Sequence, residues 1–221
     1  MVVHPEAVTA AQQQAVLGYW TPERMAALTT PSSGNTPRSA PDGAPWTGAD
    51  TLSRTVGRLF FTNHGEDESC TATVVNSANR STVVTAGHCV NSPDLLGNDN
   101  QWLSNELFVP GYHDGLAPYG TFVARAGVAD ATWLRNKEHP EPRGEWGAPC
   151  VLGGGSSGGP RIADFDPSSG IGTVGDDTLS AFFDSSGQVC DHGNAACLRH
   201  LVGPQFTSAI TKPLYKAAER S

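Results

Sequence analysis

Residues 70–89 read CTATVVNSANRSTVVTAGHC, and this stretch decides the fold class. Two runs of β-branched residues flank a polar turn at 76–80, which is typical of a β-hairpin. The midpoint between Cys70 and Cys89 falls at that turn, so the folded hairpin places the two cysteines opposite each other. We predict a disulfide between them, worth roughly 3 kcal/mol of stability, that holds the segment containing His88 against the first strand.

Further short strands are predicted on both sides of the hairpin. The runs TVGRLFFT (55–62), LFVPGY (107–112) and GTFVARA (120–126) are β-like and are separated by turn residues. The 221 residues include 25 Gly and 16 Pro, a composition typical of a loop-rich chain with many turns. Together these features predict an all-β fold.

The two ends of the chain differ from this β-rich middle. Residues 5–28 have helical character, and Thr21 followed by Pro22 is typical of a helix start. Residues 29–50 are rich in Thr, Pro, Ser and Gly and are predicted to form a linker, while 205–219 are predicted to form a terminal helix. We therefore divide the chain into a helical segment with its linker, 1–50, and one domain, 51–221.

Charge and apolar content exclude two classes of partner. The formal net charge is -8 and no basic run occurs, whereas nucleic-acid binding needs a basic face. No apolar run approaches the roughly 18 residues of a membrane helix. The first residues lack the basic and apolar parts of a signal peptide, but five cysteines favour an exported, disulfide-bonded protein. We expect a secreted protein.

A second short stretch, GGGSSGGP at 153–160, is either a flexible linker or a site of chemistry. A linker does not require the Pro160 and the apolar run after it, which is typical of another strand. GSSGGP (155–160) resembles the serine box Gly-Asp-Ser-Gly-Gly-Pro of the chymotrypsin-like serine proteases. VTAGHC (84–89) resembles the histidine box of the same family, and the two boxes occur in the family's order.

The resemblance covers roughly residues 55–215 and is closest to the bacterial secreted glutamyl-endopeptidase-like branch. It implies two antiparallel β-barrels, or an incomplete pair, preceded by a prosegment and ended by a short helix. It also implies a serine endopeptidase that acts on peptide or protein substrates as a monomer, with no cofactor and no metal ion. Ser157 would be the nucleophile, His88 the general base and then acid, and the amides of Gly155 and Ser157 the oxyanion hole.

One alternative keeps the serine chemistry but changes the fold. The letters 155–159 also satisfy the G-x-S-x-G nucleophile elbow of α/β-hydrolases, for which His192 or His200 could serve as base and Asp184 as acid. That fold needs a helix directly after the serine, which Gly-Gly-Pro disfavours, and no βαβ alternation precedes the motif.

The acid of the triad is the least defined member of the site. Four aspartates lie between the histidine and serine boxes, and Asp130 is the best candidate because an apolar run, Ala-Thr-Trp-Leu, follows it. Its alternative role is that of a loop or cap residue. The other three lie in polar loops or turns: Asp94, Asp99 and Asp114.

The spacing of the boxes suggests a missing segment. Only 69 residues separate His88 from Ser157, much of the interval is polar, and Cys150 has no evident partner. We hypothesise that the acid strand and the partner of Cys150 are absent between about residues 136 and 144. The alternative function is then an impaired or inactive pseudo-protease.

Two further features bear on the second half of the domain. Cys190 and Cys197 flank a Gly-Asn turn, which favours a small disulfide loop over a zinc site that would also use the nearby histidines. Val151 occupies the position at which trypsin-like members carry an acid, so preference for Lys or Arg is not expected. Residues 178–183 resemble the strand that pairs with the substrate backbone in the family.

Overall fold

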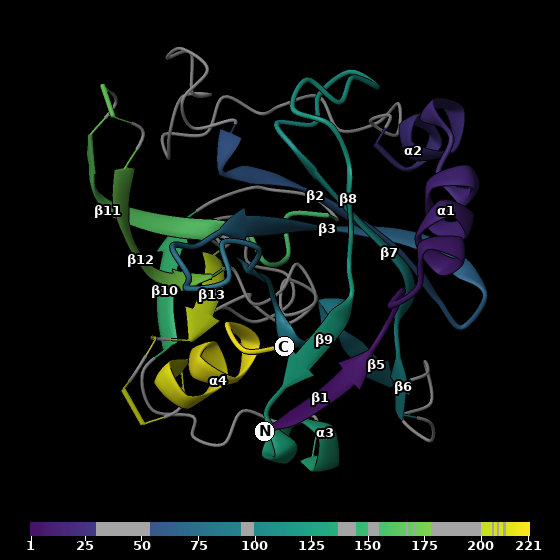
Figure 1. Ribbon diagram of the computed structural model, residues 1–221. Coiled ribbons are helices and arrows are strands. Elements are labelled where there is room, and N and C mark those ends of the chain that lie inside the picture. Colours follow the sequence, from purple (N-terminus) through teal and green to yellow (C-terminus); the bar gives the residue numbers. More distant parts are fainter. Residues whose placement is uncertain are drawn as a thin grey trace, which may run out of the picture.

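Antiparallel β-sheet makes up most of the regular structure (Figure 1). The computed structural model describes residues 1–29, 54–93, 100–136, 145–149, 155–166, 168–169, 171–177, 200–204, 206, 208–209 and 211–221. The region 178–183, together with Val151, Cys150, Cys190 and Cys197, lies outside these residues.

The largest sheet has five antiparallel strands in the order β4-β3-β2-β7-β8. Their bounds are β2 (Val56–Asn63), β3 (Glu66–Val74), β4 (Val83–Val84), β7 (Ser104–Pro110) and β8 (Phe122–Val123). A two-residue turn joins β2 to β3, and both of its residues, His64 and Gly65, have positive φ angles of 49° and 86°. Two-residue hairpin turns need this backbone conformation because it matches the twist of the strands.

Side chains of β2 alternate between two buried clusters, so both faces of the sheet are covered. Leu59 and Phe61 pack with both disulfide cysteines and Leu103 on one face. Phe60, which is fully buried, points to the other face and packs with Trp20 from the N-terminal segment. This period of two is the signature of a strand between two apolar layers.

The predicted hairpin and disulfide are confirmed. Strand β3 pairs with β4 through Thr73 opposite Val84, and a short 3-10 helix, η2 (Gly87–Cys89), follows. Cys70 on β3 is bonded to Cys89 with a Cα–Cα distance of 6.2 Å. The hairpin therefore ties η2 to the middle of the large sheet.

The N-terminal segment forms one strand and two helices: β1 (Val2–Pro5), α1 (Ala10–Tyr19) and α2 (Pro22–Thr29). The predicted start of the second helix is confirmed, because the Arg24 amide donates to Oγ1 of Thr21 over 3.2 Å. Strand β1 was not predicted. It pairs with β9 (Ala126–Ala129), a partner so distant in the chain that no local pattern signals the pairing.

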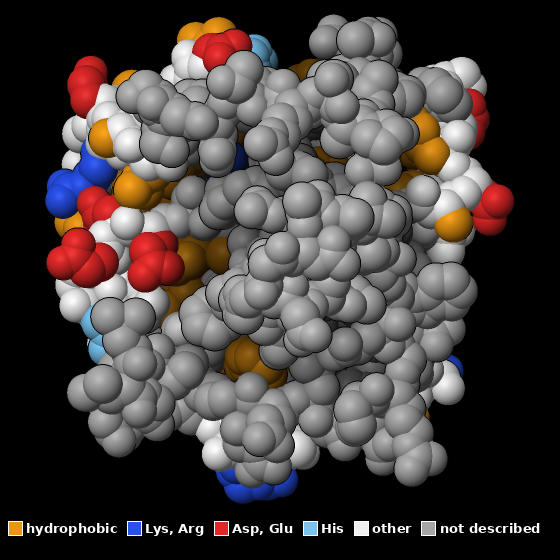
Figure 2. All heavy atoms as spheres, turned by 180° about the vertical axis from the view of Figure 1, so that it is seen from behind, with side chains coloured by type: hydrophobic (Ala, Val, Ile, Leu, Met, Phe, Trp, Pro, Cys, Tyr) orange, Lys and Arg blue, Asp and Glu red, His pale blue; other side chains and the backbone are white. Residues whose placement is uncertain are grey.

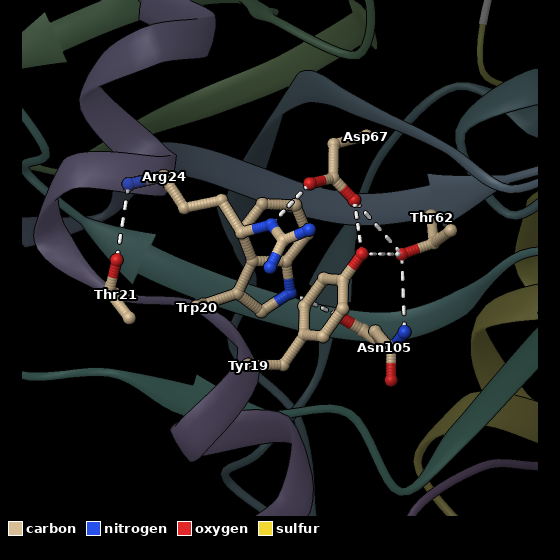
Figure 3. A network of polar contacts seen from close by, with 7 residues as sticks. All are labelled: Tyr19, Trp20, Thr21, Arg24, Thr62, Asp67 and Asn105. Carbon is tan, nitrogen blue, oxygen red and sulfur yellow. Dashed lines mark hydrogen bonds and ion pairs between the residues drawn. The ribbon is translucent and has the colours of Figure 1, made fainter.

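Helix α1 and the turn after it are fastened to the large sheet by a polar network (Figure 3). The Tyr19 hydroxyl donates to Asp67 Oδ1 over 2.7 Å, and Nε of Arg24 donates to the other carboxylate oxygen over 2.5 Å. Trp20, only 3% exposed, donates its indole N–H to the Asn105 carbonyl over 2.6 Å. Residues 1–29 thus supply part of the core of the domain.

The remaining elements complete the domain. Two-stranded sheets are formed by β5 (Asn91–Pro93) with β6 (Asn100–Trp102), β10 (Glu145–Pro149) with β13 (His200–Pro204), and β11 (Pro160–Asp166) with β12 (Ile171–Asp177). Figure 1 shows β10 to β13 on the side of the molecule away from α1 and α2. A short helix, α3 (Ala131–Asn136), follows β9.

The predicted terminal helix is present as α4 (Thr211–Ala218). Its end contacts the turn of the hairpin, because Nδ2 of Asn79 donates to the Ala218 carbonyl over 3.1 Å and the Ala78 amide donates to Glu219. None of the described helices is both long and apolar enough to span a membrane. Among the described residues visible in Figure 2, charged side chains of both signs occur.

Two carboxyl groups are buried where the N-terminal segment meets the sheet. Glu106 on β7 is 6% exposed and Glu6 is next to it, with Nε2 of His4 3.6 Å from Oε1 of Glu6. Oε1 of each glutamate lacks a hydrogen-bond partner among the described residues. Burial raises the pKa of Glu6 to about 7, and burial with the neighbouring Glu6 charge raises the pKa of Glu106 well above its usual range.

We predict that the contribution of Glu6 to the stability of the folded protein is lost as the pH rises from 4.5 to 7. The unfolded chain releases the Glu6 proton near 4.5 but the folded chain holds it to about 7, so the Glu6 contribution to the free energy of unfolding falls by about 3 kcal/mol across this window. In urea unfolding at several pH values, the unfolding free energy of the wild type minus that of Glu6→Gln should fall across this window. Exposed Glu66→Gln is the control, and an unchanged slope in Glu6→Gln contradicts the prediction.

Candidate active site

His88 lies in η2, with its ring against the disulfide. One of its ring nitrogens is within 4.8 Å of both sulfur atoms, and because both are bonded to each other, neither is a free thiolate for a metal ion. The wall beside η2 is Trp133 of α3, since a Cβ on Gly87 would lie 2.7 Å from the indole. Burial lowers the pKa of His88 to about 4, so the imidazole is neutral at pH 7.

Ser157 lies in a tight turn that leads into β11. Glycines on both sides have positive φ angles, 87° at Gly155 and 78° at Gly158, a conformation that glycine adopts without strain. The Gly159 amide donates to the Ser156 carbonyl over 2.9 Å and closes the turn. Ser157 itself is 5% exposed. The predicted strand after the serine box is confirmed as β11.

The serine turn is seated between β3 and the segment that enters η2. The Thr71 amide donates to the Ser157 carbonyl over 2.7 Å. A Cβ on Gly158 would lie 2.2 Å from both the Thr71 carbonyl oxygen and Oγ1 of Thr85, and 2.9 Å from the Ala86 nitrogen. The two sequence boxes therefore meet at β3, where Cys70 holds one and its neighbour Thr71 holds the other.

Asp130 follows β9 and caps α3. Its Oδ1 accepts from the Thr132 amide over 2.7 Å. Partial burial raises the pKa of Asp130, but hydrogen bonds from Thr132 and the Trp133 amide outweigh it and lower the pKa overall. Within the described part of the chain, no carboxylate offsets the effect of burial on His88. The triad role of Asp130 remains a prediction, and capping is the role its contacts display.

Arg58 was missed in the sequence and contacts the serine turn. Its Nη1 donates to the Gly155 carbonyl over 2.8 Å, and the Thr71 hydroxyl donates to the same oxygen over 2.8 Å. The signal that could have found it is a cation inside the otherwise apolar run 55–62. The alternative catalytic and zinc-site residues Asp184 and His192 lie outside the described residues, as does the side chain of His200.

Two solved structures are similar to the chain in fold. The thermostable serine protease AL20 from an extremophilic microorganism has a TM-score of 0.59 and 22% identity, covering 78% of this chain and 100% of its own. The protease Anisep from Arthrobacter nicotinovorans has a TM-score of 0.52 and 22% identity, covering 79% of this chain and 99% of its own. No protein-family model and no curated protein matches the chain. The predicted all-β, chymotrypsin-type fold is thereby confirmed.

The close packing of the serine turn against β3 predicts that two glycine substitutions differ strongly in their cost to unfolding free energy. Gly158→Ala places a methyl group against Thr71 and Thr85, whereas a Cβ on Gly120, also at positive φ, meets nothing within 4 Å. Gly120→Ala should cost about 1–2 kcal/mol of unfolding free energy for the backbone conformation alone. Gly158→Ala should cost more and should raise hydrogen exchange at the Thr71 amide. Equal costs in urea unfolding would show that the turn is not seated there.

Proposed function

We propose that the chain is a serine endopeptidase of the glutamyl-endopeptidase-like branch of the chymotrypsin-like proteases. The observation that carries the proposal is the seating of the serine turn on β3 beside the segment that enters the His88 helix. The fold shared with two solved protease structures supports it. The substrate class is peptides or proteins.

The chemistry follows from the state of the two side chains. A serine hydroxyl is a weak nucleophile at neutral pH and needs an adjacent base. His88 is neutral at pH 7 because it is buried, so its unprotonated ring nitrogen can take the Ser157 proton as the hydroxyl oxygen attacks the substrate carbonyl. The imidazolium then gives that proton to the leaving amine, and water releases the acyl group from Ser157 by the same steps.

The developing oxyanion needs donors that are already in place. The amides of Gly155 and Ser157 are the proposed pair, on a turn whose carbonyls at both positions are held by the large sheet. Donors preorganised in this way stabilise the transition state without reorganising during the reaction. No cofactor takes part in these steps.

A second candidate is an impaired or inactive pseudo-protease. The observation that favours it is the burial of His88 with no offsetting carboxylate among the described residues. A histidine without its acid populates the wrong tautomer, and turnover falls by about four orders of magnitude. The hypothesis of a missing segment concerns residues 136–144, of which 137–144 lie outside the described residues.

The domain boundaries, the compartment and the oligomeric state complete the proposal. We place the protease domain at 51–221, with 1–50 as a propeptide-like segment and linker, of which residues 1–29 pack against the large sheet and share one of its buried clusters. The disulfide between Cys70 and Cys89 supports secretion, since such bonds persist in oxidising compartments. A monomer is expected to suffice, because the nucleophile, the base and the amides all come from one chain.

A fluorophosphonate probe tests the enzyme directly. We expect stoichiometric modification of Ser157, located by mass spectrometry, and loss of that modification in His88→Ala and Ser157→Ala. The exposed variant Arg80→Gln should react like the wild type. Absence of labelling in a folded wild-type protein would favour the pseudo-protease.

The pH dependence of labelling tests the state of His88. Only the neutral imidazole accepts the serine proton, so the rate falls as the pH drops through the histidine pKa. With that pKa at about 4, we expect labelling to persist from pH 7 to about 5 and to fall near 4. A fall between pH 6 and 7 would show that a carboxylate raises the pKa of His88.

Asp130→Asn separates the two roles of Asp130. Asparagine caps helices as well as aspartate does, so stability should be kept while the charge is lost. If Asp130 is the triad acid, turnover of a peptide substrate falls by about four orders of magnitude. An unchanged rate assigns it to capping alone.

A further inference from the structure

Two carbonyl groups of the serine turn are anchored to the large sheet. The Gly155 oxygen accepts two hydrogen bonds of 2.8 Å, from Nη1 of Arg58 on β2 and from Oγ1 of Thr71 on β3. The Ser157 oxygen accepts a third, of 2.7 Å, from the Thr71 amide. Two neighbouring strands thus hold the turn at alternate residues.

These anchors restrict the amides that the proposed mechanism uses. Peptide groups are planar, so fixing the Gly155 and Ser157 carbonyls fixes the peptide groups that follow each residue. The Ser157 amide belongs to the peptide group between these two, and the φ and ψ rotations of Gly155 separate its own amide from its anchored carbonyl. Glycine has more freedom about these two bonds than any other residue, so the turn needs contacts from outside it to fix its conformation.

The guanidinium of Arg58 packs directly against Gly155 in the serine turn. A Cβ on Gly155 would lie 2.0 Å from Nη1 of Arg58, so the guanidinium fills the space that a side chain at 155 would need. Burial lowers the pKa of Arg58, and within the described residues no carboxylate contacts it. Burying a charged guanidinium without a counter-ion costs free energy on folding. Its hydrogen bond to the Gly155 carbonyl is charge-assisted and strong, and offsets part of that cost.

We infer that Arg58 is a positioning residue of the site, which acts through the Gly155 carbonyl to hold the oxyanion-hole amides in place. Thr71 shares this task through its hydroxyl. The inference rests on the proposed function, because it assigns the purpose of the anchored turn to acyl transfer. A merely structural arginine would change stability without changing reactivity at Ser157.

The experiment uses the full chain with four variants: Arg58→Gln, Arg58→Lys, Thr71→Val and the double variant Arg58→Gln/Thr71→Val. Lysine keeps the charge but loses the planar fork of donors, and valine keeps the Thr71 amide while removing its hydroxyl. Arg80→Gln, an exposed arginine on the hairpin turn, is the control for loss of a positive charge. Melting temperatures identify any variant that does not fold.

The first measurement is the rate constant for fluorophosphonate labelling of Ser157, with kcat and KM for a peptide substrate. We expect Arg58→Gln to lower the labelling rate and kcat about tenfold to a hundredfold with little change in KM, since small displacements at a reacting site have effects of that size. The labelling rate and kcat of Arg58→Lys should lie between those of Arg58→Gln and the wild type. The double variant should lose more than the product of the single losses, because both donors hold one oxygen.

The second measurement does not depend on activity. The ¹⁵N–¹H signals of Gly155 and Ser157 should shift or broaden in Arg58→Gln and stay in place in Arg80→Gln. If the wild type is not labelled, the proposed function fails, and these signals alone decide the inference. Unchanged signals, or labelling of folded Arg58→Gln at the wild-type rate, would overturn it. If Arg58→Gln does not fold, Arg58→Lys and Thr71→Val supply the same comparison.

Discussion

The disulfide between Cys70 and Cys89 is the constraint on which the candidate site depends. It joins the middle of β3 to the short helix that carries His88. The next residue of β3, Thr71, holds the serine turn through its amide and its hydroxyl. Two segments far apart in the chain are thus fastened to adjacent residues of one strand, so their separation is set by the geometry of β3 and not by the loops between them.

Three ionisable groups of the large sheet and η2 share one physical setting, which is burial with no ion-pair partner among the described residues. Removal from water disfavours the charged form, so it lowers the pKa of His88 and Arg58 and raises that of Glu106. A buried neutral imidazole is ready to accept a proton but is a weaker base. The activity of the site therefore depends on which groups of the protein stabilise the His88 imidazolium once it forms.

Local patterns were enough to predict much of the fold, and the two boxes were identified by their resemblance to the serine protease family. The β-branched runs, the turn at 76–80 and the cysteine spacing predicted the hairpin and its disulfide. The pairing of β1 and the contact of Arg58 with the Gly155 carbonyl depend on partners distant in the chain, and the sequence marks Arg58 only as a cation inside the run 55–62. Asp130 had two possible roles in the sequence, and only coordinates reveal the α3 amide that it caps.

The most direct test of the account is the distance between Oγ of Ser157 and the nearer ring nitrogen of His88 in a crystal structure at neutral pH. The account predicts about 2.6–3.2 Å, or one bridging water, as between a nucleophile and its base. A separation of more than about twice that distance, with both the disulfide and the bond from the Thr71 amide intact, would contradict it.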